Sequence, residues 1–142
     1  MSQDSKPLQW TDELATGIEV IDMQHKRLIS ILNEANLCFR DNGDAERRKQ
    51  VIDDLVSYTV YHFDTEEMLM KNSRAGAVPA EHEQCHIQEH RAFAAKATEY
   101  QAAVHADASI DCDTVFSFLN HWIVQHVMGT DKKLGEHLQT AP

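Results

Sequence analysis

Apolar side chains recur along this chain at intervals of three and four residues, the spacing that places them on one face of an α-helix. The pattern predicts helices over residues 18–40, 45–72, 80–105 and 111–135. Turn-forming residues separate them, with Gly43 in the first break and Gly76 and Pro79 in the second. Asp44 is placed to cap the second helix, and Gly135 to end the fourth. We find no strand pattern, so we expect an all-α protein built as an antiparallel up-down-up-down four-helix bundle.

Composition and charge narrow the classes of function. The 142 residues suit a single domain spanning 1–142, with residues 1–9 as a flexible N-terminal tail. A formal net charge of −10 argues against binding to nucleic acid or to an anionic membrane surface. No apolar run is long enough to cross a bilayer, and the polar N-terminus lacks the apolar core of a signal peptide, so we expect a cytoplasmic protein. The three scattered cysteines are interpreted as free thiols.

The histidines are the unusual feature of the composition. The chain has nine of them, and each predicted helix carries at least one on its apolar face. Two carboxylates join them, Glu66 one turn after His62 and Asp131 five residues after His126, which gives a set of seven: His25, His62, Glu66, His86, His90, His126 and Asp131. One buried histidine is usually a hydrogen-bonded core residue, but seven polar groups in one interior would be under-satisfied without a metal ion. The set therefore predicts a metal site inside the bundle.

For two polar residues next to this set, His82 and Glu67, the sequence leaves the role open. His82 lies four residues before His86 and is a rival ligand, although its position is rotated towards the edge of the helix face. Glu67 points about 100° away from Glu66 and is either solvated or hydrogen-bonded to a ligand. Of the remaining histidines, His105 and His137 lie near helix ends and are expected to face solvent, and His121 is expected at the surface or in an interface.

The spacing between His126 and Asp131 does not fit a regular helix. Five residues correspond to about 500° of rotation, which leaves the two side chains about 140° out of alignment. Asp131 therefore reaches the site only if the helix is locally distorted. Gly129, between the two residues, makes the backbone there easier to loosen.

The types of ligand favour iron over the other common metals. Seven ligands exceed the four of a zinc site, and no thiolate stands at ligand spacing. Calcium and magnesium prefer oxygen-rich sites, whereas imidazole with carboxylate suits iron among others. Two carboxylates that each bridge two metal ions would explain seven ligands. The ferritin-like pattern of Glu-x-x-His fits poorly, because only Glu83 and His86 have that form on an apolar face.

Five groups of residues, in order along nearly the whole chain, carry a resemblance to a known family. They are Trp10; Ile21-Asp22-Met23-Gln24-His25-Lys26; His62-Phe63 with Glu66-Glu67; His86 with His90; and Trp122 with His126 and Asp131-Lys132-Lys133. In this combination the sequence resembles the hemerythrin family, specifically the bacterial single-domain hemerythrins. Each group alone is a weak signal, whereas the combination is highly specific.

The resemblance implies a four-helix bundle that holds a non-haem di-iron site, with a bridging oxo or hydroxo group, and binds O2 reversibly. It assigns three histidines to the iron whose coordination is filled: His86, His90 and His126. It assigns His25 and His62 to the iron with an open position, and Glu66 and Asp131 as the bridging carboxylates. An apolar O2 pocket would map onto Leu28, Phe63, Trp122 and Val127; ordinary core packing is the alternative interpretation of these four, and both can hold together.

Several functions remain compatible with such a site. A binding protein for O2 carriage, storage or sensing is the leading hypothesis, and a di-iron enzyme acting on peroxide, O2 or nitric oxide is the alternative. The histidines on the apolar faces argue strongly against a metal-free helical interaction protein. Nothing in the chain resembles an output domain, and the sequence does not identify a reductase or signalling partner.

Overall fold

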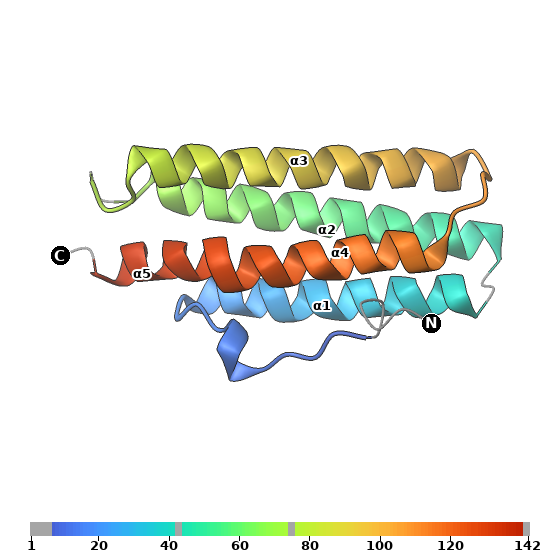
Figure 1. The fold of residues 1–142 in the computed structure, drawn as a ribbon, viewed down its shortest axis with the longest axis horizontal. Coiled ribbons are helices and arrows are strands. Elements are labelled where there is room, and N and C mark those ends of the chain that lie inside the picture. Colours follow the sequence, from blue (N-terminus) through green and yellow to red (C-terminus); the bar gives the residue numbers. More distant parts are fainter. Residues whose placement is uncertain (1–6, 42–43, 74–75, 141–142) are drawn as a thin grey trace.

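Four antiparallel helical rods form the molecule in the computed structural model, which describes residues 7–41, 44–73 and 76–140 (Figure 1). The first three rods are α1 (Glu19–Arg40), α2 (Ala45–Lys71) and α3 (Ala80–His105). The fourth is continuous through α4 (Cys112–Gln125), a π-helical turn, η3 (His126–Asp131), and α5 (Lys132–Thr140). A short 3₁₀ turn, η2 (Asp12–Leu14), precedes them, and the described residues contain no strand. The prediction of an all-α up-down-up-down bundle is confirmed.

Two of the helices, α2 and α4, begin where a side chain accepts a hydrogen bond from a backbone N–H of the first turn. The backbone N–H of Arg47 donates to Asp44 at 2.8 Å, so the predicted cap of α2 is confirmed. Asp111 accepts in the same way from the N–H of Asp113, at 3.1 Å, at the start of α4. Pro79 stands at the N-cap position of α3, where it has no N–H to leave unsatisfied.

Two apolar clusters fill the interior, one on each side of the predicted metal ligands. The larger cluster spans most of the bundle and includes the fully buried Leu32, Phe93 and Phe116. The smaller consists of Ile21, Met70 and Leu134, at the end where α1 begins and α2 ends. Burial of these side chains supplies the main driving force for folding, so the polar ligands are held between two close-packed regions.

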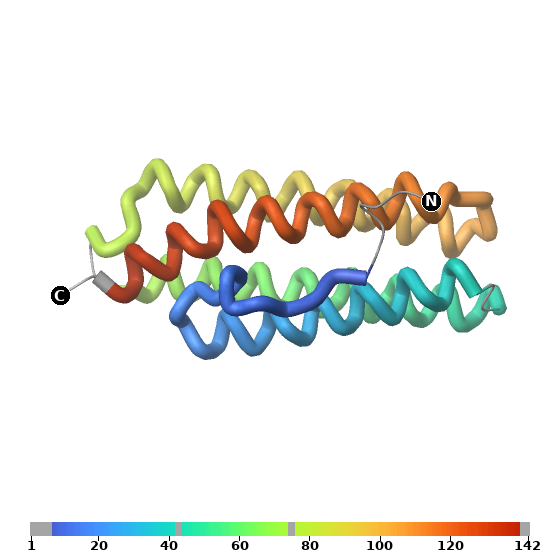
Figure 2. The backbone as a smooth tube through the Cα atoms, turned by 60° about the horizontal axis from the view of Figure 1, so that its bottom comes forward, coloured from blue at the N-terminus to red at the C-terminus, as the bar shows by residue number. Residues whose placement is uncertain are grey.

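The N-terminal segment is attached to the bundle from Leu8 onward and runs along α1 (Figures 1 and 2). The N–H of Leu8 donates to Asn33 Oδ1 at 2.9 Å, and Asn33 Nδ2 donates to the carbonyl of Leu8 at 2.8 Å. Trp10 is half-buried against the larger cluster, with Lys26 Nζ 5.0 Å from its ring centroid. Residues 1–6 lie outside the described ranges. Leu8, within the tail predicted over residues 1–9, therefore pairs its backbone with a side-chain amide of α1, and the flexibility of the tail stays a prediction.

Gly135 does not end the fourth rod, contrary to the prediction from sequence. α5 continues through it to Thr140. A Cβ atom at Gly135 would lie 2.4 Å from the carbonyl oxygen of Thr16, closer than any real contact. The glycine allows the lead-in to α1 to approach α5, and this packing outweighs its low helix propensity.

The state of the cysteines and the character of the helices can be set beside the expectations from sequence. Cys38, Cys85 and Cys112 are free, with Cys85 exposed and the other two half-buried. Within the described ranges, no helix combines the length and apolar character needed to span a bilayer.

Candidate metal centre

All seven predicted ligands meet at one place inside the bundle, and each is at most 3% exposed. α1 contributes His25, α2 contributes His62 and Glu66, α3 contributes His86 and His90, and η3 contributes His126 and Asp131. Their nitrogen and oxygen atoms form two groups, within each of which these atoms lie no more than 4.8 Å apart. The first group is Glu66, His86, His90, His126 and Asp131, and the second is His25, His62, Glu66 and Asp131. The two carboxylates belong to both groups, which is the arrangement expected of bridging ligands.

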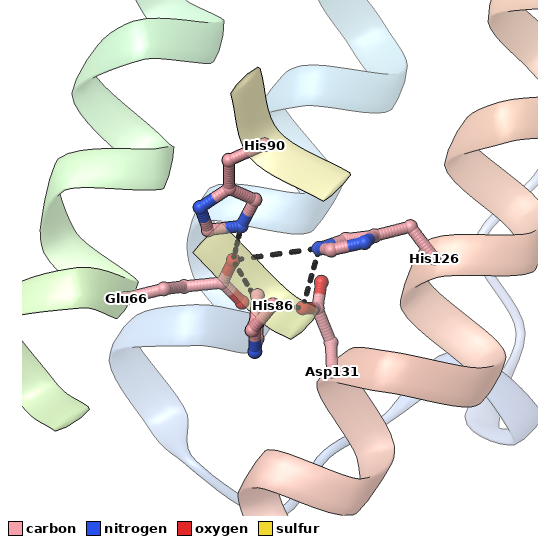
Figure 3. Close-up of side chains that lie close together, drawn as sticks. All are labelled: Glu66, His86, His90, His126 and Asp131. Atoms are coloured by element: carbon pink, nitrogen blue, oxygen red, sulfur yellow. Dashed lines mark hydrogen bonds and ion pairs between the residues drawn. The ribbon is translucent and has the colours of Figure 1, made fainter. Parts of the chain in front are cut away.

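The first group brings three imidazoles from α3 and η3 against the two carboxylates (Figure 3). Nε2 of His90 lies 3.0 Å from Glu66 Oε1, and Nε2 of His86 lies 3.4 Å from the same oxygen. On the other side, Asp131 Oδ1 lies 3.0 Å from Nε2 of His86 and 2.9 Å from Nε2 of His126. All three imidazoles therefore present the same ring nitrogen to the interior of the group.

The second group brings His25 and His62 against the same two carboxylates. Nε2 of His25 lies 2.8 Å from Asp131 Oδ2 and 3.9 Å from Glu66 Oε2. Nε2 of His62 lies 3.5 Å from Glu66 Oε1. Asp131 thus turns one oxygen to the histidines of each group, as a carboxylate that joins two metal ions would.

The directions of these polar atoms fit a metal better than they fit one another. His25 Nε2 and His126 Nε2 lie within 3 Å of Asp131 oxygens, yet neither makes a hydrogen bond of acceptable angle. Both oxygens of Asp131 and Nε2 of His62 are likewise buried without a hydrogen bond. A buried unsatisfied polar group costs about 1–3 kcal/mol. Close atoms that do not point at one another are expected when they share a common ion, and this set of nitrogens and oxygens suits iron.

A second layer of polar residues holds the outer nitrogen, Nδ1, of four of the five ligand histidines. The pairs, with their distances, are His62 with Gln24 Oε1 (2.8 Å), His86 with His82 Nε2 (3.1 Å), His90 with Glu67 Oε2 (2.9 Å) and His126 with Glu89 Oε1 (3.0 Å). Such partners select the tautomer that offers Nε2 to a metal and orient the ring. Thr130 in turn donates its hydroxyl to Glu89 at 2.8 Å.

Sequence reasoning missed two of these outer partners and identified two incompletely. Glu67 is hydrogen-bonded to the predicted ligand His90, which is one of the two alternatives that the sequence left open. His82, the rival ligand, instead bonds to the predicted ligand His86. Gln24 and Glu89 were not predicted. Each contacts a histidine on another rod, so only the depth and rotation of the packed helices decide the pairing. Their one local signal is that each immediately precedes a predicted ligand, His25 or His90.

The π-helical turn explains how His126 and Asp131 reach the same site. In this turn, each backbone hydrogen bond joins residues five apart rather than four, which widens the helix. The turn spans His126–Asp131 and contains Gly129, where the sequence predicted a distortion. It brings Asp131 Oδ1 to 2.9 Å from His126 Nε2.

Burial and charge pairing shift the pKa values within the centre in opposite directions. Burial would raise the pKa of Glu66, and so would the Asp131 carboxylate, but the neighbouring imidazoles of His126, His86 and His90 hold it at about 2. Burial would lower the pKa of His86, but the adjacent carboxylates of Asp131 and Glu66 raise it to about 9. For His62, burial dominates and lowers the pKa to about 4.

The stability of the metal-free protein is expected to be greatest near pH 6.5. Below that pH, unfolded His62 binds a proton that the folded state excludes down to about pH 4, so stability falls with acid. Above it, folded His86 keeps a proton up to about pH 9 that the unfolded state has lost, so stability falls with base. Each group contributes a slope of up to about 1.4 kcal/mol per pH unit. Urea unfolding in chelator from pH 4 to 9 measures this, and a flat profile would contradict it.

The four residues predicted to line an O2 pocket lie in or against the larger apolar cluster. Leu28, Phe63 and Val127 are buried, and Trp122 is half-buried. The ring of Phe63 stacks on His90 with centroids 3.9 Å apart, and Trp122 stacks on His126 at 4.4 Å. A cavity of about 130 Å³ beneath the N-terminal segment is lined in part by Val127, but not by the other three residues.

Comparisons with known proteins agree with this geometry. The family described as hemerythrin HHE cation binding domain matches residues 16–138. The chain is 31% identical to a bacteriohemerythrin of Stenotrophomonas maltophilia over 132 residues, covering 93% of this chain and 82% of that one. It is 33% identical to a bacteriohemerythrin of Pseudomonas aeruginosa over 130 residues, covering 87% and 76%. A crystal structure of wild-type hemerythrin superposes with a TM-score of 0.80 at 27% identity, covering 95% of this chain and all of the other. The chain therefore belongs to the hemerythrin family.

Proposed function

We propose that this protein binds O2 reversibly at a non-haem di-iron site, as an O2 carrier, store or sensor. The observation that carries the proposal is the pair of ligand groups that share Glu66 and Asp131. One group offers five protein ligands and the other four. The ion in the second group, held by His25 and His62, would have the smaller number of protein donors and therefore a position for an exogenous ligand.

The ligand side chains would neutralise only part of the charge of two iron ions. Five neutral imidazoles and two carboxylates would offset half of the charge of two Fe²⁺ ions. Four of the five histidines have an outer hydrogen bond that favours the metal-binding tautomer, such as that from His62 to Gln24. When bound, the iron pair supplies an exchangeable coordination position and the electrons that O2 binding needs.

The apolar surroundings support a small uncharged ligand. Leu28, Phe63 and Val127 are each at most 4% exposed, so bulk water has little access to the interior next to the centre. The ring centroid of Phe63 lies 6.0 Å from that of His62, which belongs to the group with fewer protein ligands. An apolar wall at this position favours O2 over charged ligands, because it offers no hydrogen bonds to replace their hydration.

Anaerobic reduction followed by exposure to O2 tests the function. We expect two iron ions per chain, a new visible absorption on adding O2, and return of the reduced spectrum when O2 is removed. A sample loaded with Zn²⁺, which has no redox chemistry, should show no change. One metal ion per chain, or none, would overturn the proposal, whereas turnover with a reductant or rapid irreversible oxidation would favour a di-iron enzyme.

A further inference from the structure

A surface cleft of about 860 Å³ opens beside the group that holds the larger number of protein ligands. Its lining includes His82, Cys85, Glu89, Thr130, Lys133 and His137. Two of these, His82 and Glu89, hold the outer nitrogens of the ligands His86 and His126. The cleft is therefore separated from two ligand imidazoles by one side chain each.

His82 differs from the other outer partners in chemistry and in origin. It lies on the same helix as its ligand, one turn earlier, whereas Gln24, Glu67 and Glu89 reach across from another rod. It is also the imidazole in this layer, where the others are an amide and two carboxylates. Its ring is half-buried and meets the ring of His137 edge-on at 5.1 Å, so His137 also lines the cleft and is not simply solvent-facing as predicted.

The geometry at His86 determines which way the hydrogen bond must run. Nε2 of His86 faces the carboxylates, 3.0 Å from Asp131 Oδ1, and is the atom that can bind a metal. The proton of a metal-bound neutral imidazole then resides on the other nitrogen, Nδ1. Nδ1 of His86 lies 3.1 Å from Nε2 of His82. His86 is the donor in this pair, and His82 must be the acceptor.

We propose that His82 is a positioning residue of the metal centre, which accepts the Nδ1–H of His86 and thereby fixes the tautomer and orientation of that ligand. The proposal rests on the proposed function, because it concerns the same metal site. His82 is not a ligand itself, since its Nε2 is engaged with His86 and it belongs to neither ligand group. Outer partners of this kind typically change metal affinity by about 10–100-fold.

Four variants separate this role from a general structural one. His82→Leu removes the acceptor, and His82→Lys replaces it with a group that can only donate. His82→Gln restores an acceptor oxygen. His137→Leu removes the ring contact with His82 but keeps the hydrogen bond between His82 and His86. If the leucine variant does not fold, the lysine variant, whose ammonium can extend into the open cleft, tests the same loss.

Fe²⁺ affinity, measured anaerobically by chelator competition, is the first measurement. We expect the leucine and lysine variants to bind iron about 10–100-fold more weakly than wild type, and the glutamine and His137→Leu variants to stay within about threefold. A leucine or lysine variant that stays within threefold of wild type would overturn the role of His82. Failure of the wild type itself to bind iron would overturn the proposed function instead.

The second measurement does not need iron. In the ¹⁵N-labelled metal-free protein, His86 should show a slowly exchanging Nδ1–H resonance because His82 accepts it. The resonance should be lost in His82→Leu and retained in His82→Gln and His137→Leu. Its persistence in His82→Leu would show that the hydrogen bond with His82 is not what protects that proton.

Discussion

Glu66→Ala is expected to abolish loading of two iron ions while leaving the helical content close to that of wild type. Glu66 belongs to both ligand groups, so its loss removes a donor from each and one of the two bridges between them. The four rods keep their apolar clusters, because the replaced side chain belongs to neither. Iron per chain and far-ultraviolet circular dichroism measure the two parts of this expectation.

Glu67→Ala is the matched control for this variant. Glu67 is the next residue on α2 and also a carboxylate, but it is one-third exposed, bonds to the outer nitrogen of His90 and belongs to neither ligand group. We expect the control to bind two iron ions with about 10–100-fold weaker affinity. Normal loading of two ions by Glu66→Ala would rule out the bridging role, and with it the two-metal interpretation of the site.

Removal of the metal is expected to lower the melting temperature by about 15 °C. An ion that binds only the folded protein stabilises it by about 4 kcal/mol when its free concentration is 1,000 times the dissociation constant. For a domain of this size, each kcal/mol corresponds to a few degrees. The structural reason is that the metal would satisfy buried atoms that otherwise lack hydrogen bonds, including both oxygens of Asp131.

Differential scanning calorimetry with and without chelator measures this shift. The Glu66→Ala variant is the control, because a protein that binds no iron pair should melt at the same temperature in both conditions. An equal melting temperature for the wild type with and without iron would count against a buried, metal-satisfied centre. The reversed case, stabilisation by the chelator, would indicate that bound metal favours the unfolded chain.

The metal centre shows where local pattern is enough to predict structure and where it is not. The limits of α3, Ala80 and His105, match the expected range because Pro79 and the Ala106-Asp107 turn end the apolar period locally. The placement of His86 and His90 follows from the same period, since residues four apart share a helix face. Asp131 is different, because its alignment with His126 depends on a π-helical turn that spacing alone does not specify.

Spacing along each helix is enough to predict that four amphipathic helices form and that six of the seven polar ligands, all except Asp131, point into their shared interior. The packing of the rods sets which oxygen of Asp131 faces which histidines, which residues hold the outer nitrogens, and why Gly135 lies within a helix. These contacts join residues of different rods. They depend on the relative rotation and depth of the packed helices, which the periodicity of a single helix does not specify.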